Sequence, residues 1–164
     1  MSEALIGGLR QAGVAGERIR VANPTAAKRE RLQQHYGIVG YPHGAEAVVG
    51  ADVVVLSVKP QIMRSVLAEI PIARGTTVVS VAAGLSSDTL RSWIAEPVQM
   101  VRVMPNTPSL MGQGMSGLYA DASVPETARA QAEFIAAAAG QTVWLEDEAQ
   151  MHALTALSGS GPAY

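Results

Sequence analysis

Apolar residues along the chain form short β-prone runs that alternate with segments of helical periodicity. Three runs are almost continuously apolar, and each ends in a stiff or glycine-bearing loop: Asp52–Pro60 (DVVVLSVKP), Thr76–Gly84 (TTVVSVAAG) and Met100–Pro108 (MVRVMPNTP). Strands that are apolar on both faces are typical of a parallel sheet covered by helices on both sides. The alternation therefore predicts an α/β fold with a doubly wound, mostly parallel sheet, in which 52–58 is a central strand.

Turn and capping residues delimit the other expected elements. Asn23 and Ser86 are expected to cap helices, and Ser123 and Glu126 to form a capping box before an alanine-rich helix. Expected helices are 2–12, 24–36, 44–49, 61–69 (with Ile62, Val66 and Leu67 inward), 86–93, 126–139 and 147–157. Further expected strands are 18–22, 38–41, 98–103, 142–145 and, at an edge, 115–119.

Length and composition bound the class of protein. At 164 residues the chain is one domain's worth of sequence, and 48% apolar against 16% charged residues suits a doubly covered sheet. A net charge of −2 gives no electrostatic case for binding nucleic acid or an anionic membrane. No apolar run approaches the roughly 18 residues that span a bilayer. The absence of cysteine excludes disulfides and thiolate metal sites and is compatible with a cytoplasmic, soluble protein.

The loops after the three apolar runs are candidates for one shared crevice, because open α/β sheets bind ligands beyond the carboxyl ends of their strands. Ser57–Pro60 offers backbone groups and an ammonium to a ribose or nicotinamide, or is an ordinary strand exit with its lysine in water. Ala82–Gly84 is small enough for a ligand to lie against the backbone, or is simply tightly packed. Asn23, with cations at Lys28 and Arg29, suits a ribose 2′-phosphate, or caps a helix with a solvated basic face.

Other polar residues give weaker signals. No histidine has a metal-like partner one helical turn away, so no metal site is predicted. Ser158 and Ser160 do not resemble a nucleophile elbow. Glu146, Asp147 and Glu148 are interpreted as a solvated charge cluster at a helix N-terminus. No catalytic acid or base is therefore assigned.

Four blocks, SVKPQ, VSVAAGLS, VRVMPNTP and ALSGSGPAY, occur in this order, and together they resemble pyrroline-5-carboxylate reductase over the whole chain. The resemblance implies a Rossmann domain that binds NADPH, or alternatively NADH. It implies hydride transfer to 1-pyrroline-5-carboxylate, which gives L-proline in the last step of proline biosynthesis. It also implies a cytoplasmic homo-oligomer for the full-length protein. Oxidoreductases of the prephenate or deazaflavin type share the architecture, but the MPNTP and SGSGPAY blocks argue against them.

The same resemblance implies which residues contact the cofactor. Asn23 would lie at the adenosine ribose or its phosphate, and Gly44 stands where many relatives carry an asparagine. The residues implied on the ribose and nicotinamide side are Ser57, Val58, Lys59 and Pro60; those on the facing loop are Val81, Ala82 and Ala83; those beside the nicotinamide and the substrate ring are Met104, Pro105 and Asn106. The proton donor is expected outside these residues.

The resemblance also divides the chain into expected domains. Residues 1–157 would be a Rossmann-like NAD(P)-binding domain that lacks the first strand and the glycine loop, and 158–164 the start of a C-terminal helical domain that builds the dimer. The glycine loop receives the pyrophosphate on backbone N–H groups, so residues 1–164 alone are expected to be inactive. The alternative is a non-catalytic, truncated nucleotide-binding or oligomerisation module. Loss of a central strand is also expected to expose an apolar edge that favours association.

Overall fold

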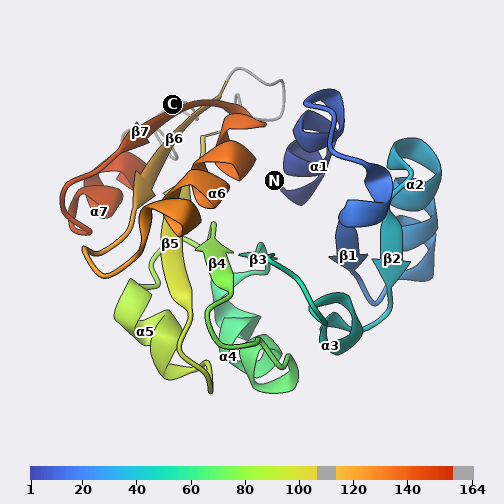
Figure 1. Cartoon of the computed structure of the whole chain (residues 1–164), viewed down its shortest axis with the longest axis horizontal. Coiled ribbons are helices and arrows are strands. Elements are labelled where there is room, and N and C mark those ends of the chain that lie inside the picture. Colours follow the sequence, from blue (N-terminus) through green and yellow to red (C-terminus); the bar gives the residue numbers. More distant parts are fainter. Residues whose placement is uncertain (107–113, 157–164) are drawn as a thin grey trace.

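The chain folds into two neighbouring β-sheets with helices packed around them (Figure 1). The computed structural model describes residues 1–106 and 114–156. Its helices are α1 (Ser2–Gln11), the 3-10 turn η1 (Gly16–Arg18), α2 (Ala26–Tyr36), α3 (Gly44–Ala47), α4 (Pro60–Glu69), α5 (Ser87–Ser92), α6 (Glu126–Ala137) and α7 (Gln150–Leu154). Its strands are β1 (Arg20–Ala22), β2 (Val39–Tyr41), β3 (Val53–Leu56), β4 (Thr77–Ser80), β5 (Gln99–Met104), β6 (Gly114–Tyr119) and β7 (Gly140–Trp144). Within these residues no helix is long and apolar enough to cross a membrane.

The larger sheet has five strands in the order β3-β4-β5-β6-β7, and the smaller sheet pairs β1 with β2. Neighbouring strands run parallel except for β5 and β6, which are antiparallel. Leu56 of β3 lies opposite Ser80 of β4, and Ser80 lies opposite Arg102 of β5. The prediction of an α/β fold with a mostly parallel sheet is confirmed.

Two strands lie elsewhere in the sheet than the sequence indicates. The strongly apolar β3 is not central: it forms one edge of the five-stranded sheet, because no described strand pairs with its other side. β6 is not an edge strand, because it lies between β5 and β7. Both errors concern partners from distant parts of the chain, which a local apolar pattern does not specify.

Successive residues of the five-stranded sheet enter two apolar clusters, one on each face. On one face, Val78 packs with Met63 of α4 and Leu90 of α5. On the other face, Val79 packs with Ala132 and other alanines of α6. The sheet is therefore covered on both sides, by α4 and α5 on one face and by α6 on the other (Figure 1).

A second, smaller unit comprises β1, β2 and α2, which we call the β1–β2 part; β3 to β7 with α4 to α7 form the five-stranded part. The β1–β2 part has a small core in which Leu32 of α2 and Ile38 pack against Ile6 of α1. In Figure 1 the β1–β2 part lies to one side of the five-stranded part. The chain passes from one part to the other through α3, and α1 packs against both. No hydrogen-bonded strand pair joins the two sheets within the described residues.

Two predicted helix caps have different outcomes. The hydroxyl of Ser86 accepts a hydrogen bond from the N–H of Thr89 at 3.2 Å, so the predicted cap of α5 is confirmed. The side-chain oxygen of Asn23 accepts a hydrogen bond from the N–H of Thr25 at 2.9 Å. The N-cap of α2 is Thr25, and the helix begins at Ala26. The prediction that Asn23 caps this helix is therefore wrong, because its side chain closes a local turn before the helix instead.

Two further details of the helices differ from expectation. Ser123 makes hydrogen bonds to the carboxylate of Asp121 rather than to α6, so the predicted capping box does not form. Of the three residues of α4 that were expected inward, Leu67 is buried, Val66 is half-buried and Ile62 is 49% exposed. Met63 is buried in place of Ile62, so the prediction for Leu67 is confirmed and the one for Ile62 is wrong.

Candidate functional site

The loops that follow β3, β4 and β5 leave the sheet along one edge, because these strands run parallel and in register. The N–H of Val81 donates to the carbonyl of Leu56 at 3.2 Å, which ties the exit of β4 to the end of β3. The three groups of residues predicted at the nicotinamide side, 57–60, 81–83 and 104–106, therefore lie on neighbouring exits.

The exit of β3 presents polar groups to solvent. Pro60 is the first residue of α4, and its fixed φ favours the start of a helix at that position. The exposed hydroxyl of Ser57 lies 2.8 Å from the hydroxyl of Ser2 at the start of α1. Lys59 is also exposed, and it forms no ion pair with a described residue. Val58 packs instead against the apolar cluster beneath α4, so this exit offers a hydroxyl and an ammonium to a ligand.

The exit of β4 is built from small residues. Ala82 is buried, and its N–H donates to the hydroxyl of Ser80 at 3.3 Å, whereas Ala83 and Gly84 are exposed. Gly84 has a φ of 77°, and a Cβ at this position would meet no atom within 4 Å. Val81 packs against the cluster on the α6 face. The backbone from Ala83 onward is therefore open to a ligand, while Ala82 and Val81 belong to the core.

The exit of β5 is anchored to the neighbouring strand. Met104 is buried at the end of β5, and the side-chain oxygen of Asn106 accepts from the N–H of Met115 in β6 at 3.0 Å. Thr107 and Pro108, which complete the MPNTP block, and the residues 158–162 of the SGSGPAY block lie outside the described residues. An apolar recess beside this exit is lined by Met1, Leu5, Val79, Val81, Val103, Pro105, Ser116, Ile135 and Ala136.

Asn23 lies on the other sheet. It directly follows β1, and its carbonyl accepts from the guanidinium of Arg29 at 2.6 Å, so this cation is engaged by the backbone. Lys28 on α2 is exposed. Gly44 begins α3, where an added Cβ would lie 2.7 Å from a methyl group of Ile70. The structure thus brings together the predicted residues of three strand exits but places Asn23 on a separate sheet.

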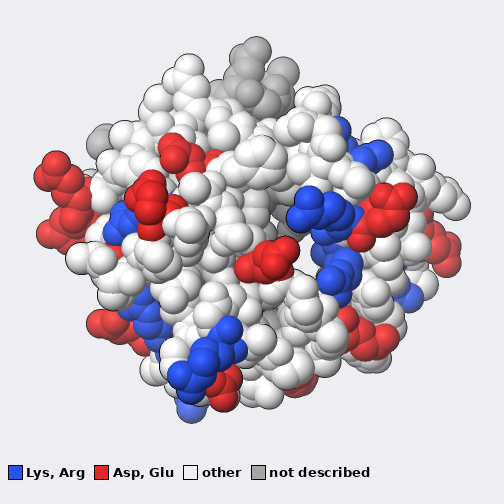
Figure 2. All heavy atoms as spheres, in the orientation of Figure 1, with Lys and Arg blue, Asp and Glu red and all other residues white. Residues whose placement is uncertain are grey.

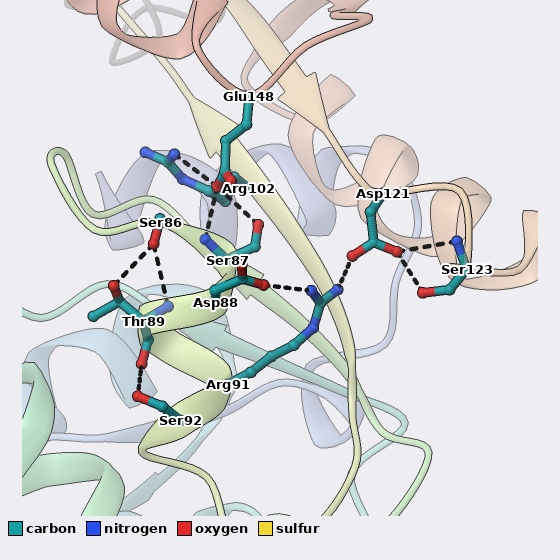
Figure 3. Close-up of polar contacts among 10 residues, drawn as sticks. All are labelled: Ser86, Ser87, Asp88, Thr89, Arg91, Ser92, Arg102, Asp121, Ser123 and Glu148. Atoms are coloured by element: carbon teal, nitrogen blue, oxygen red, sulfur yellow. Dashed lines mark hydrogen bonds and ion pairs between the residues drawn. The ribbon is translucent and has the colours of Figure 1, made fainter.

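Sequence reasoning missed a buried ion pair on the five-stranded sheet. Arg102 of β5 is 3% exposed, and its guanidinium lies 3.0 Å from the carboxylate of Glu148 (Figure 3). The same carboxylate oxygen accepts from the N–H and the hydroxyl of Ser87 at 2.6 and 2.9 Å. Burial alone would raise the pKa of Glu148, but hydrogen bonds from Ser87 and Arg102 outweigh it and hold the pKa below its ordinary value. The interpretation of Glu148 as a solvated charge is therefore wrong.

A second ion pair lies next to the first and fixes the other end of α5. The guanidinium of Arg91 contacts the carboxylate of Asp121, which follows β6, and it lies 3.5 Å from Asp88 (Figure 3). A hydrogen bond from the Ser123 hydroxyl lowers the pKa of Asp121, against the opposing effect of burial, and Arg91 lowers it further. Because these charges are paired with one another, we interpret both ion pairs as structural. The signal for the first was an arginine inside an otherwise apolar strand, which requires a buried partner.

Comparisons with known proteins place the chain in a family. Residues 1–84, just over half of the chain, match the family model described as NADP oxidoreductase coenzyme F420-dependent. The pyrroline-5-carboxylate reductase of Pseudomonas aeruginosa is 47% identical over 166 aligned residues, which cover 100% of this chain and 61% of the relative. The pyrroline-5-carboxylate reductase of Haemophilus influenzae is 40% identical with the same coverage.

Solved structures agree with this match. A pyrroline-5-carboxylate reductase from Coxiella burnetii superposes with a TM-score of 0.93 at 34% identity, over 99% of this chain and 62% of that one. The pyrroline carboxylate reductase of Plasmodium falciparum, solved with NADP bound, gives a TM-score of 0.81 at 27% identity over 98% and 59% of the two chains. A prephenate dehydrogenase from Aquifex aeolicus gives 0.76 at 15% identity over 96% and 62%, which shows a shared fold alone.

The two kinds of comparison cover different lengths of sequence. The family model stops at Gly84, whereas the reductase relatives align with the whole chain, including the MPNTP and SGSGPAY blocks. The chain in turn spans about 61% of the length of these curated relatives. The chain therefore belongs to the family described as coenzyme F420-dependent NADP oxidoreductases, and it corresponds to the N-terminal NAD(P)-binding domain of pyrroline-5-carboxylate reductases.

Proposed function

We propose that the chain supplies the cofactor-binding part of an enzyme that reduces 1-pyrroline-5-carboxylate to L-proline with NADPH, or alternatively with NADH. The observation that carries this proposal is the 47% identity to the Pseudomonas aeruginosa reductase across the whole of this chain. The chain spans about 61% of that relative, so the complete reaction is proposed for a protein of the relative's full length. We further propose that this longer protein is a cytoplasmic homo-oligomer.

The strand exits carry exposed polar groups and open backbone, which suit the nicotinamide side of such a cofactor. The exposed Ser57 hydroxyl, the open backbone at Ala83 and the Lys59 ammonium, which forms no ion pair with a described residue, lie on neighbouring exits. When bound, the cofactor supplies the hydride. In our proposal the residues listed next hold and orient it from the β3, β4 and β5 exits: Ser57, Val58, Lys59, Pro60, Val81, Ala82, Ala83, Met104, Pro105 and Asn106.

The adenosine side is less complete in this chain. Asn23, proposed for the ribose or its phosphate, follows β1, and β1 belongs to a different sheet from the three exits. A dinucleotide that reached from Lys59 to Asn23 would have to cross the interval between the two sheets. This supports the proposal that residues 1–164 alone are inactive. It also favours, for the isolated chain, the second candidate function: a non-catalytic nucleotide-binding or oligomerisation module.

The test uses the product of the gene read to its natural ends, with residues 1–164 measured in parallel. Both proteins are assayed for NADPH oxidation in the presence of 1-pyrroline-5-carboxylate, and for NADPH binding by calorimetry. Activity of the long form alone supports both proposals. Binding of NADPH by the long form without turnover would reject the substrate, and activity of 1–164 would reject the inactivity of the isolated chain. A folded long form that neither binds nor turns over would favour the non-catalytic module.

A matched pair of variants in the long form tests the site itself. Lys59→Ala removes the exposed ammonium from the β3 exit, and we expect the KM for NADPH to rise about tenfold, the cost of one charge-assisted hydrogen bond. Arg64→Ala removes an exposed cation from α4, five positions along the chain from Lys59, and is expected to leave the KM unchanged. Equal effects of the two variants would mean that Lys59 acts only through the general charge of this surface.

A further inference from the structure

The two ion pairs near α5 differ in the elements that they join. Arg102 lies in β5, and Glu148 lies in the segment before α7. The guanidinium of Arg91 in α5 instead contacts Asp121, which follows β6 (Figure 3). β6 runs antiparallel to β5, and Tyr119 lies opposite Arg102, so Asp121 is further from the carboxyl end of β5. Of the two pairs, the one of Arg102 and Glu148 is therefore the closer to the strand exits of the candidate site.

One carboxylate oxygen of Glu148 joins two elements that carry these exits. Its Oε1 accepts from the guanidinium of Arg102 at 3.0 Å and from the N–H and the hydroxyl of Ser87 at 2.6 and 2.9 Å. Ser87 is the first residue of α5, where the exit of β4 ends. Arg102 lies opposite Ser80, the last residue of β4, and two positions before Met104, the last residue of β5. We call these hydrogen bonds of Oε1 to Ser87 and Arg102 the Glu148 bridge.

The exit of β4 is anchored at both of its ends. At its start, the N–H of Val81 donates to the carbonyl of Leu56 at 3.2 Å. At its end, the N–H of Ser87 donates to Glu148. The exposed Ala83 lies between these two anchors. The open backbone of the candidate site is therefore held between a contact with β3 and the Glu148 bridge.

Burial makes the bridge suited to fixing a distance. Figure 2 shows acidic and basic side chains spread over the face that it presents, where water weakens the attraction between them. Ser87 and Arg102 are instead 2% and 3% exposed. Hydrogen bonds to a charged group are stronger than neutral ones, and they are stronger still where water is excluded. Because all of these donors converge on one oxygen, α5 and β5 must keep their separation for the bridge to form.

We propose that Glu148 is a positioning residue for the candidate site. Its Oε1 sets the distance between the β4 exit and the end of β5, and with it the fit of these two exits around the nicotinamide side of the cofactor. Glu148 needs no contact with the cofactor, because it acts through Ser87 on the backbone around Ala83 and through Arg102 on β5. The consequence for hydride transfer rests on the proposed function, whereas the bridge between the two elements does not.

The first test follows backbone hydrogen exchange in the long form without ligand. Glu148→Ala removes the bridge, and Asp121→Ala, which breaks the other ion pair, is the control. We expect exchange of the Val81 and Ala82 amides to accelerate at least about tenfold in Glu148→Ala, beyond any change at Val79 inside β4. In Asp121→Ala, exchange at Val81 and Ala82 should change no more than at Val79. Equal behaviour of the two variants would reject the bridge, whether or not the protein turns over the substrate.

The second test separates positioning from stability by steady-state kinetics of the long form. We expect Glu148→Ala to lower the kcat for 1-pyrroline-5-carboxylate about thirtyfold, because a displacement of about 1 Å at the reacting groups can cost about a hundredfold. The KM for NADPH should change by less than about threefold. Glu148→Gln keeps an oxygen that accepts from both donors but loses the charge, so its thermal midpoint should fall while its kcat stays within about threefold of the unchanged protein. If kcat followed the thermal midpoint through Glu148→Ala, Glu148→Gln and Asp121→Ala alike, the positioning role would be rejected.

A milder matched pair serves if Glu148→Ala does not fold. Ser87→Ala removes one hydroxyl from Glu148, and Ser123→Ala removes one hydroxyl from Asp121, while both ion pairs remain. We expect kcat to fall about fivefold in Ser87→Ala and to stay unchanged in Ser123→Ala, and equal values would overturn the proposal. A long form that is inactive without any substitution would overturn the proposed function instead. Exchange at Val81 would then still decide whether the bridge holds the β4 exit.

Discussion

The β1–β2 part and the five-stranded part are built from similar elements but are held together by different forces. In the five-stranded part, two apolar clusters cover both faces of the sheet, and a buried ion pair joins α5, β5 and the segment before α7. In the β1–β2 part, the buried core consists of Ile6, Leu32 and Ile38, and the ion pair that joins α1 to α2 is exposed. Buried contacts contribute far more to stability than exposed ion pairs do.

This difference suggests that the two parts unfold with different free energies. The five-stranded part contains both tryptophans, Trp93 and Trp144, so its unfolding can be followed by fluorescence. The β1–β2 part contains no tryptophan, and hydrogen exchange reports on it instead. Together these two signals show whether the two parts are as unequal in stability as their contacts indicate.

The largest effect is expected from the buried ion pair of the five-stranded part. Glu148→Ala leaves the guanidinium of Arg102 buried without its carboxylate and removes the acceptor of Ser87. We expect the free energy of unfolding to fall by about 3 kcal/mol, as for other broken buried pairs. Urea denaturation followed by tryptophan fluorescence measures this loss. The control is Glu146→Ala, an exposed acid two residues earlier, which should change the free energy of unfolding by no more than about 0.5 kcal/mol. Equal losses in the two variants would show that the pair of Arg102 and Glu148 adds nothing to stability.

The next largest effect is expected at the contact of α1 with the five-stranded part. A Cβ at Gly8 would collide with the backbone carbonyl of Ala138, so Gly8→Ala should displace α1 and cost about 2 kcal/mol. Gly7→Ala is the matched control, because a Cβ there would lie 3.4 Å from the ring of Tyr36, an ordinary contact. Alanine also favours a helix over glycine, so Gly7→Ala should be neutral or stabilising by up to about 1 kcal/mol.

The readout for this pair is hydrogen exchange in the two parts. Gly8→Ala should accelerate exchange in β1 and β2 more than in β4 and β5, because it loosens the helix that connects them. Equal acceleration in all four strands would contradict the comparison, since it would mean that the chain unfolds as a single cooperative unit.

Several features of the fold could be read from the sequence because their causes are local. The helix 2–12 was predicted from its spacing and is observed as Ser2–Gln11, and the α2 helix ends at Gly37, which has a φ of 69°. The cap at Ser86 was also predicted correctly. Each of these depends on residues within one helical turn, and local chemistry decides them.

The errors have causes that lie far away in sequence. β3 has the composition of a central strand but lies at an edge, and Glu148 appears as one of three neighbouring acids until Arg102, 46 residues earlier, is placed beside it. The sequence likewise predicted one part of the candidate site correctly and not the other. The exits of β3, β4 and β5 do lie together, as expected of parallel strands, whereas Asn23 follows β1, which belongs to the other sheet.

A smaller effect is expected from acid. The pKa values of Glu148 and Asp121 lie below their ordinary values of 4.5 and 3.8, so both carboxylates stabilise the folded state when charged. Their contribution is complete above the ordinary values and is lost as the pH falls through them toward the lowered ones. We therefore expect the five-stranded part to lose stability below about pH 5, with a shallower loss in Asp121→Asn. Urea titrations at stepwise lower pH measure the slope, and an unchanged slope in Asp121→Asn would reject this assignment.

The smallest effect is expected from the exposed ion pair between Glu3 and Arg31. A hydrogen bond from Arg31 holds the pKa of Glu3 at about 2, but both side chains are largely exposed, so water and salt screen most of this interaction. Glu3→Gln should accelerate hydrogen exchange in α1 and α2 slightly at low salt and leave β4 and β5 unchanged. The difference should vanish near about 1 M salt, where the Debye length is only about 3 Å. Glu30→Gln, an exposed acid of α2 with no ion pair within the described residues, is the control. If Glu3→Gln lowered the free energy of opening of α2, measured by hydrogen exchange, by as much as Glu148→Ala lowers the free energy of unfolding, the comparison would be overturned. The β1–β2 part would then depend on one surface pair as strongly as the five-stranded part depends on its buried pair.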